Sequence, residues 1–347
     1  MPPYSQKSIA RSRGFSRSLA TSIFTSGLKV PCSDKTTSAN AKRFGKDRKG
    51  TQRYRCLSCS KTFTTQERVE GKYLPLDKAV LCLQLLVEGN SLRSVERITG
   101  VTLHPLLDLL LLVGEKCERL FDDKIKDVPV RDVQADEMWG YVGMKEKTKK
   151  RKMAADALSV DATLGDAYTF VAIERHTKLV LAWHLGRRTV KHTVDFTEKL
   201  YEATSGRFQL TTDGFAAYPD AVAYSLGTRV DFAQLIKIYS QPRDGEHRYS
   251  PAEVVEAIPS PRWGNPIPER ICTSHVERHN LTMRMMIRRL TRLTNAFSKK
   301  WENLHAALAL HFAYYNFCRI HKSIRCTPSM EAGITKTVWT LKDLLTY

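Results

Sequence analysis

The stretch DVQADEMWG at residues 132–140 decides the fold, because it alternates like a half-buried strand and its first half ends on a carboxylate, Asp136. Two further carboxylates hold comparable places. Asp213 follows the apolar run 208–212, and Glu277 lies near the start of a helical segment that begins at residue 274. Two strand-end aspartates and one helical glutamate can converge to hold two Mg²⁺ ions, which prefer oxygen ligands. The chain has 36 acidic residues, so this pattern alone does not separate a metal site from surface charge.

The segments around these carboxylates predict an α/β layer architecture. Two apolar runs joined by a polar turn predict a β-hairpin, and a helix and two strands follow: 166–174 with 178–186, then 191–202, 208–212 and 232–239. Six prolines within 241–270 indicate a loop or a loose insertion. From residue 274 to 317 the pattern is helical again. Residues 301–319 place Leu304, Leu308 and Phe312 at helical spacing, which indicates a core helix.

A helix drawn over residues 274–297 would have two distinct faces. Val276, Met283, Ile287 and Leu290 would form a buried stripe, and Glu277 would share the adjacent face with Arg284 and Arg288. Seven basic residues and no acidic residue lie between positions 278 and 300. Such a run is usually a solvated face, but beside a metal site its arginines are placed to hold a DNA backbone.

Three sequence blocks carry a resemblance to a known family. They are DEMWGYVG at 136–143, TDGF at 212–215 and HVERHNLTMR at 275–284, with RLTR at 289–292 and QRYRC at 52–56 in support. Together they resemble the DDE transposases of insertion sequence one and its relatives, over residues 29 to about 320. Two features depart from that family: Lys29 stands where its first ribbon cysteine is expected, and 64 positions separate Asp213 from Glu277, which we interpret as an insertion near 241–270.

The resemblance implies a ribonuclease-H-like catalytic domain, a mixed sheet with flanking helices, that cleaves element ends and joins the freed 3′ hydroxyls to target DNA. Asp136, Asp213 and Glu277 match the catalytic positions and would hold two Mg²⁺ or Mn²⁺ ions. The implied partner is double-stranded DNA, bound by a homodimer or larger assembly in the cytoplasm at the nucleoid. Two alternatives stay open: an inactive or domesticated transposase that regulates through DNA binding, and a nuclease or resolvase of the same fold that hydrolyses without joining.

The amino-terminal part predicts smaller modules. Residues 1–28 are expected to be a disordered basic arm, although their composition is also that of a transit peptide. Within 29–66, Cys56 and Cys59 form a C-x-x-C turn, and Cys32 is a third candidate ligand for Zn²⁺, which usually takes four. The alternative is a ribbon that has lost its metal and is held by Phe44, Tyr54 and Phe63. Both possibilities stay open.

Residues 74–126 predict a helix-turn-helix, with Ser91 capping one helix and Gly100 making the turn before the next. The helix expected at 103–112 has seven leucines and no Lys or Arg, so a plain helical hairpin is the alternative. The catalytic domain is expected at 130–320 and a carboxyl-terminal tail at 321–347.

Charge supports a polyanionic partner. The chain has 55 Lys and Arg against 36 Asp and Glu, a net charge of +19, which is also typical of ribosome-associated and basic membrane-binding proteins. No stretch reaches the roughly 18 apolar residues of a membrane span, so no membrane partner is expected. The arginines expected to contact DNA phosphates are Arg53, Arg55, Arg278, Arg284, Arg288 and Arg292.

Overall fold

The computed structural model describes residues 41–48, 50–64, 67–156, 160–240, 254–292 and 294–347. It divides the chain into two compact units, Met1–Leu76 and Asp77–Tyr347. Among the described helices, none is by itself long and apolar enough to cross a membrane. Only the helices Leu92–Thr99 and Leu103–Lys124 taken together, a pair bent by 113°, reach that length and composition.

The first unit is a small antiparallel sheet of β1 (Ala41–Lys46), β2 (Gln52–Cys56) and β3 (Thr62–Thr64). Tyr54 stacks on Phe63 with ring centroids 5.9 Å apart. Phe44 is 40% exposed, and the guanidinium groups of Arg53 and Arg55 lie 5.7 and 5.4 Å from its ring centre. Two of the three aromatic residues expected to hold this module therefore pack together, and arginines cover the third.

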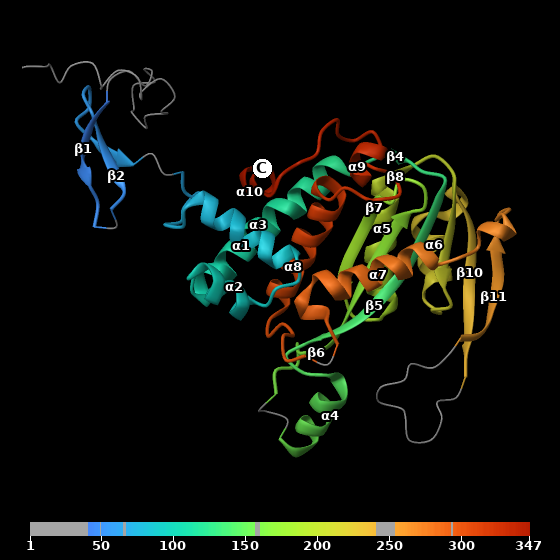
Figure 1. Cartoon of the computed structure of the whole chain (residues 1–347). Coiled ribbons are helices and arrows are strands. Elements are labelled where there is room, and N and C mark those ends of the chain that lie inside the picture. The colour runs from blue at the N-terminus through green and yellow to red at the C-terminus, as the bar shows by residue number, and fades with distance from the viewer. Residues whose placement is uncertain (1–40, 49, 65–66, 157–159, 241–253, 293) are drawn as a thin grey trace, which may run out of the picture. The chain divides into compact units, whose positions relative to one another are not determined.

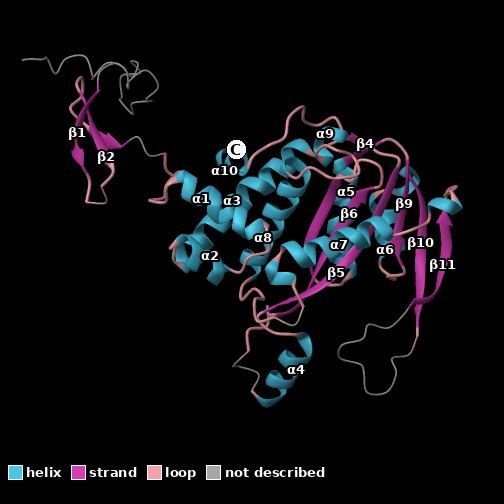
Figure 2. Ribbon diagram, viewed as in Figure 1, coloured by secondary structure: helices cyan, strands magenta, loops and turns pink. Residues whose placement is uncertain are grey.

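The second unit is built on a six-stranded mixed sheet with the order β11-β10-β9-β5-β6-β7 (Figures 1 and 2). Strands β5 (Asp132–Val142), β6 (Gly165–Glu174) and β7 (Val180–Gly186) are antiparallel neighbours. Strand β9 (Phe208–Asp213) runs parallel to β5, and β10 (Val230–Tyr239) runs parallel to β9. The predicted α/β architecture is confirmed, and this order is compatible with the ribonuclease-H-like fold.

Helices cover both faces of this sheet. On one face, α5 (Val190–Ala203) packs Phe196 against Phe170 of β6, and Thr197 of α5 donates to a carbonyl of α6 (Tyr218–Ser225). On the other face, α8 (Trp301–Ala313) packs Phe312 against Trp183 of β7, and α7 (Ser274–Met286) lies beside it (Figure 1). Because successive strand residues point to opposite faces, β5 and β6 supply side chains to both helical layers, whereas the edge strand β11 is largely exposed.

Three helices precede the sheet: α1 (Leu76–Val87), α2 (Leu92–Thr99) and α3 (Leu103–Lys124). As expected, the Ser91 hydroxyl caps α2 by accepting from the Ser94 amide at 3.1 Å, and Gly100 ends it with φ +68°. Helix α3 is longer than the predicted 103–112, and it packs along α8; four of its eight leucines are buried: Leu106, Leu109, Leu110 and Leu120. A role of its exposed side in reading DNA stays a prediction.

Helices α3 and α8 approach most closely at Gly114. A Cβ added there would lie 2.5 Å from Cβ and 2.6 Å from Cα of Ala306, so the two backbones meet without room for a side chain. We expect Gly114→Leu to lower the free energy of unfolding by at least about 3 kcal/mol, because the helices must separate. Urea unfolding measures it. Glu115→Leu, which adds the same side chain at an exposed neighbouring position, should stay within about 0.5 kcal/mol of the wild type, and equal effects would contradict the packing.

Two predicted elements differ from the structure. Residues 254–263 were expected in a loop, but they form strand β11 (Val254–Trp263), antiparallel to β10 at the edge of the sheet; residues 241–253 lie outside the described part. The helix expected over 274–297 ends at Met286, where Ile287 turns to φ −101° and ψ 96°. Ile287 and Leu290 are still buried, as the stripe predicts, but a 3-10 turn (Arg288–Leu290) brings them there.

The remaining elements are short. Strands β4 (Val128–Pro129) and β8 (Thr204–Ser205) pair in parallel, and α4 (Glu146–Ala155) follows β5. After α8, a π-helical turn (Tyr314–Cys318) leads to α9 (Pro328–Glu331) and α10 (Leu341–Thr346). The carboxyl-terminal segment packs on α3, where Tyr347 donates to Asp123 at 2.9 Å. The proposed division into domains stays a prediction.

Candidate active site

The sheet brings two of the predicted carboxylates together. Asp136 lies on β5 and Asp213 at the end of β9, and these strands are parallel neighbours. Glu277 lies in the first turn of α7, which crosses the same region of the sheet (Figure 1). All three residues line one cleft of about 370 Å³, together with the cations Arg188 and Lys237. The cleft is therefore a cluster of acids flanked by bases.

Asp136 is held on both of its oxygens. Its Oδ1 accepts from the Glu137 amide at 2.8 Å, and its Oδ2 accepts from Asn280 Nδ2 on α7 at 2.8 Å. Burial, followed by the charge of Asp213, raises the pKa of Asp136 to about 7. The isolated anion is thus disfavoured at this position, and a bound cation would relieve that penalty.

Asp213 is the last residue of β9, and the turn that follows it is held by a side chain of the neighbouring strand β10. Its Oδ1 accepts from the Phe215 amide at 3.1 Å. Gln234 of β10 donates its amide to the carbonyls of Asp213 at 2.8 Å and Phe215 at 3.1 Å. Burial raises the pKa of Asp213. The strand-end position and the turn therefore present the carboxylate at a defined point of the cleft.

Glu277 faces the cleft with a basic partner. Its Oε1 accepts from Lys237 Nζ of β10 and from the Thr273 hydroxyl. Its side chain is 44% exposed, which makes it the most accessible of the three predicted carboxylates. A cation bound between the aspartates would compete with Lys237 for this carboxylate.

Glu137 is a fourth carboxylate that the sequence interpretation did not assign to the site. Its ligand oxygen lies within 4.8 Å of those of Asp136 and Asp213, and its side chain is only 2% exposed. It accepts from Arg188 Nε at 2.6 Å and from the Tyr218 hydroxyl at 3.1 Å. Burial and the charge of Asp213 raise its pKa to about 8.

Glu137 lies on the opposite face of β5 from Asp136. This explains both why Glu137 is buried and why the sequence interpretation did not assign it to the site. Asp136 pairs across the sheet with Val171 and points toward α7, whereas Glu137 pairs with Phe170 and points toward α5 and α6. Strand alternation predicts that consecutive residues diverge. Their carboxylates still meet at the Asp213 end of the sheet. The sequence did contain a signal for this role, since an acidic residue on a buried strand face requires a charged or hydrogen-bonding partner.

The donors in the cleft suit a divalent cation. Asp136, Glu137 and Asp213 place oxygens within 4.8 Å of one another. Burial raises the pKa of each, with mutual repulsion contributing to those of Asp136 and Glu137. Hard oxygen ligands favour Mg²⁺ or Mn²⁺ over thiol-seeking metals. Asp136, Asp213 and Glu277, with Glu137 beside them, would hold such ions.

The predicted DNA-contacting arginines fall into two groups. Arg278, Arg288 and Arg292 are all exposed, as a phosphate contact requires. Arg284 instead donates to the carbonyls of Leu290 at 3.3 Å and Trp139 at 3.2 Å, and burial lowers its pKa to about 10. Arg284 therefore closes the turn after α7. Arg53 and Arg55 belong to the first unit, where Arg53 donates to Thr62 and Arg55 to the Ser60 carbonyl.

The cysteines of the first unit are described in part. Cys56 ends β2 and is buried, and Cys59 is half-buried in the turn that follows. Cys32 lies outside the described residues. Zinc binding by Cys32, Cys56 and Cys59 stays a prediction.

No protein-family model and no curated protein matches the sequence. Solved structures show distant likeness. A piggyBac transposase synaptic complex with hairpin DNA shares 10% identity at a TM-score of 0.36, covering 78% of this chain and 69% of that one. The Mos1 strand transfer complex shares 15% at 0.20, covering 48% and 61%.

Endonuclease V from Bacillus subtilis shares 11% identity at a TM-score of 0.19, covering 36% of this chain and 55% of that one. All three TM-scores are low. These likenesses are therefore too distant to establish a family or an activity for this chain.

Proposed function

We propose that the chain is a DDE-type DNA transposase of the kind its three sequence blocks resemble. The observation that supports this most directly is the one cleft that Asp136, Asp213 and Glu277 all line, each contributed by the element that its block predicts. The proposed catalytic residues are these three carboxylates. The substrates are the ends of the element and a target duplex.

Bound Mg²⁺ would activate the attacking oxygen and stabilise the leaving oxygen of an in-line displacement. The residues of the chain fix the geometry around it. Asn280 and the Glu137 amide hold the Asp136 carboxylate in one orientation, and Gln234 holds the turn that presents Asp213. These contacts preorganise the ligands before DNA arrives.

The two cations of the cleft pair with its carboxylates and could also bind DNA. Arg188 lies 3.8 Å from Asp213 and stacks over Phe215 at 4.2 Å, and Lys237 pairs with Glu277. When the carboxylates turn to a metal, these cations are released to face a phosphodiester. Arg278, Arg288 and Arg292 extend the positive surface along the segment that starts with α7.

Recognition of DNA belongs to the same proposal. The basic first unit would contact phosphates, and the α2–α3 pair would act as a helix-turn-helix with the long α3 supplying its support. Assembly as a homodimer or larger complex on DNA, and a place at the nucleoid, complete the proposal. Its rivals are a DNA-binding regulator without catalysis and a nuclease that only hydrolyses.

The test is strand cleavage and joining by the purified full chain. A duplex carrying the DNA that flanks its own reading frame is labelled at the 5′ end of the strand to be joined and mixed with unlabelled plasmid and Mg²⁺. We expect nicks at the ends of the element and transfer of the label to the plasmid. Cleavage without transfer would favour the nuclease, and tight binding without cleavage would favour the regulator.

A further inference from the structure

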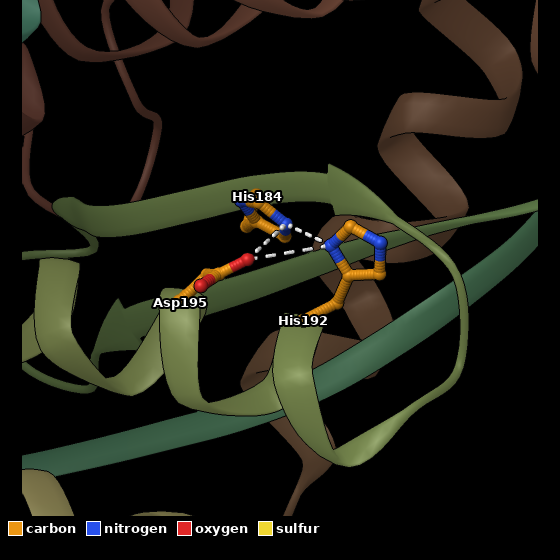
Figure 3. Close-up of side chains that lie close together, drawn as sticks. All are labelled: His184, His192 and Asp195. Atoms are coloured by element: carbon orange, nitrogen blue, oxygen red, sulfur yellow. Dashed lines mark hydrogen bonds and ion pairs between the residues drawn. The ribbon is translucent and has the colours of Figure 1, made fainter.

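Two imidazoles and one carboxylate converge outside the candidate active site, where β7 leads into α5 (Figure 3). His184 comes from β7, and His192 and Asp195 come from the first two turns of α5. His184 Nε2 lies 2.9 Å from His192 Nδ1, and Asp195 Oδ2 lies 3.9 and 3.5 Å from these two nitrogens. Three donor atoms thus face one point.

The spacing of these atoms matches a tetrahedral zinc site. With zinc bonds of about 2.0–2.1 Å, neighbouring ligand atoms in a tetrahedron lie about 3.3–3.4 Å apart. The three measured separations lie on both sides of that value. A hydrogen bond between the two imidazoles explains their 2.9 Å contact. Asp195 lies 3.5 and 3.9 Å from the two rings, farther than the usual hydrogen-bond distance, so such a bond does not account for its position.

Gly186 leaves the space that the two rings need. A Cβ there would lie 2.5 Å from Nδ1 of His192 and 3.0 Å from Nε2 of His184, directly beside both donor atoms. Any larger residue would push the rings apart. The end of β7 is therefore shaped around this pair of nitrogens.

The ligands are available to an ion. Burial lowers the pKa of His184 to about 4 and lowers that of His192, so both rings are neutral near pH 7 and each can offer a lone pair. Lys191 lies 3.6 Å from Asp195 Oδ2, but its side chain is 81% exposed and can swing into solvent. Partial exposure of all three ligands gives an entry path.

We propose that His184, His192 and Asp195 bind one Zn²⁺ ion, with water in the fourth position, and that this ion fixes the connection between β7 and α5. That connection carries Arg188, which reaches Glu137 and Asp213 in the active cleft. By fixing this connection, the bound ion would hold Arg188 in position. Its binding does not depend on the proposed transposase activity, although its effect on cleavage does.

Co²⁺ titration of the untagged full chain tests the site, because tetrahedral Co²⁺ absorbs strongly in the visible range and octahedral Co²⁺ only weakly. A Cys56→Ser, Cys59→Ser background removes the other predicted zinc ligands, and excess Mg²⁺ occupies the carboxylate cleft. We expect one equivalent of tetrahedral Co²⁺, displaced by Zn²⁺. His192→Ala should weaken binding by more than about 100-fold, whereas His104→Ala, an exposed imidazole on α3, should bind normally.

Thermal unfolding separates loss of the site from loss of the fold. Zn²⁺ should raise the melting temperature of the background protein and leave that of His192→Ala unchanged, while both melt alike in EDTA. If His192→Ala is destabilised in EDTA, Asp195→Asn and Gly186→Ala serve in its place. Absence of tetrahedral Co²⁺ in the background protein, or binding that survives all three substitutions, would overturn the proposal whether or not the chain cleaves DNA.

Discussion

Asp136→Asn should reduce DNA strand cleavage by at least about 10³-fold while leaving DNA affinity nearly unchanged, because it removes a ligand charge that two-metal displacement needs. The structure indicates that this variant folds. Asn280 Oδ1 is buried without a hydrogen-bond partner among the described residues, so rotation of the Asn280 amide lets this oxygen accept from the amide nitrogen that the substitution introduces. The measurement is the single-turnover nicking rate on a labelled end fragment, with binding followed by anisotropy.

The control and the companion variants sharpen this result. Glu277→Gln and Asp213→Asn should behave like Asp136→Asn, and pairs of them should add little because the ligands act as a unit. Glu256→Gln changes an exposed carboxylate on β11 and should cleave normally. Glu137 is unsuitable as a neutral control, since it belongs to the cluster. Near-normal cleavage by Glu277→Gln would mean that the third carboxylate lies elsewhere.

Arg188→Ala should destabilise the metal-free protein by roughly 2 kcal/mol at pH 9, because Glu137 loses the cation that pairs with it in a buried position. The figure is below that of a fully buried pair, since Arg188 is 41% exposed. The penalty depends on ionised Glu137, whose pKa is about 8 in the folded state, so it should shrink as the pH falls through 8 and be small near pH 5. Urea unfolding in EDTA at both pH values measures it.

A matched double variant tests the cause of that effect. In Arg188→Ala, Glu137→Gln the buried group is neutral, so the loss of Arg188 should cost little and the pH dependence of its effect should disappear. Arg188→Lys should recover part of the stability. An equal loss for Arg188→Ala at pH 5 and pH 9 would show that Arg188 acts through packing on Phe215 instead of through charge.

The sequence predicted the elements whose signals are local. Residues 166–174 and 178–186 are apolar runs on either side of a polar turn, and they form β6 and β7. Ser91 and Gly100 bound α2 as their capping chemistry requires. The same local logic predicted two strand-end aspartates. Asp213 does end β9, whereas Asp136 lies inside β5, which continues to Val142. The parallel pairing of β5 and β9, which brings the two together, joins residues more than 70 positions apart and carries no local signal.

The differences arise where one pattern permits two structures. Pro259 and Pro261 suggested a loop, but in β11 they pair with Leu235 and Ala233 at alternate positions. An edge strand tolerates a proline whose missing amide would face away from the sheet. After Met286 the helical periodicity continues in Ile287 and Leu290, and no glycine or proline marks the stop, so burial by a turn could not be told from burial by a helix.

The packing of α3 on α8 has a consequence for synthesis of the protein. Lys124 ends α3 and Trp301 begins α8, so 301 − 124 = 177 residues must be added before the apolar face of α3 meets its partner. At about 5–20 residues per second, a ribosome takes roughly 10–35 s to add them. During that time a row of leucines stays uncovered on the nascent chain, which makes it a substrate for chaperones, and a chain interrupted before α8 would be prone to aggregate.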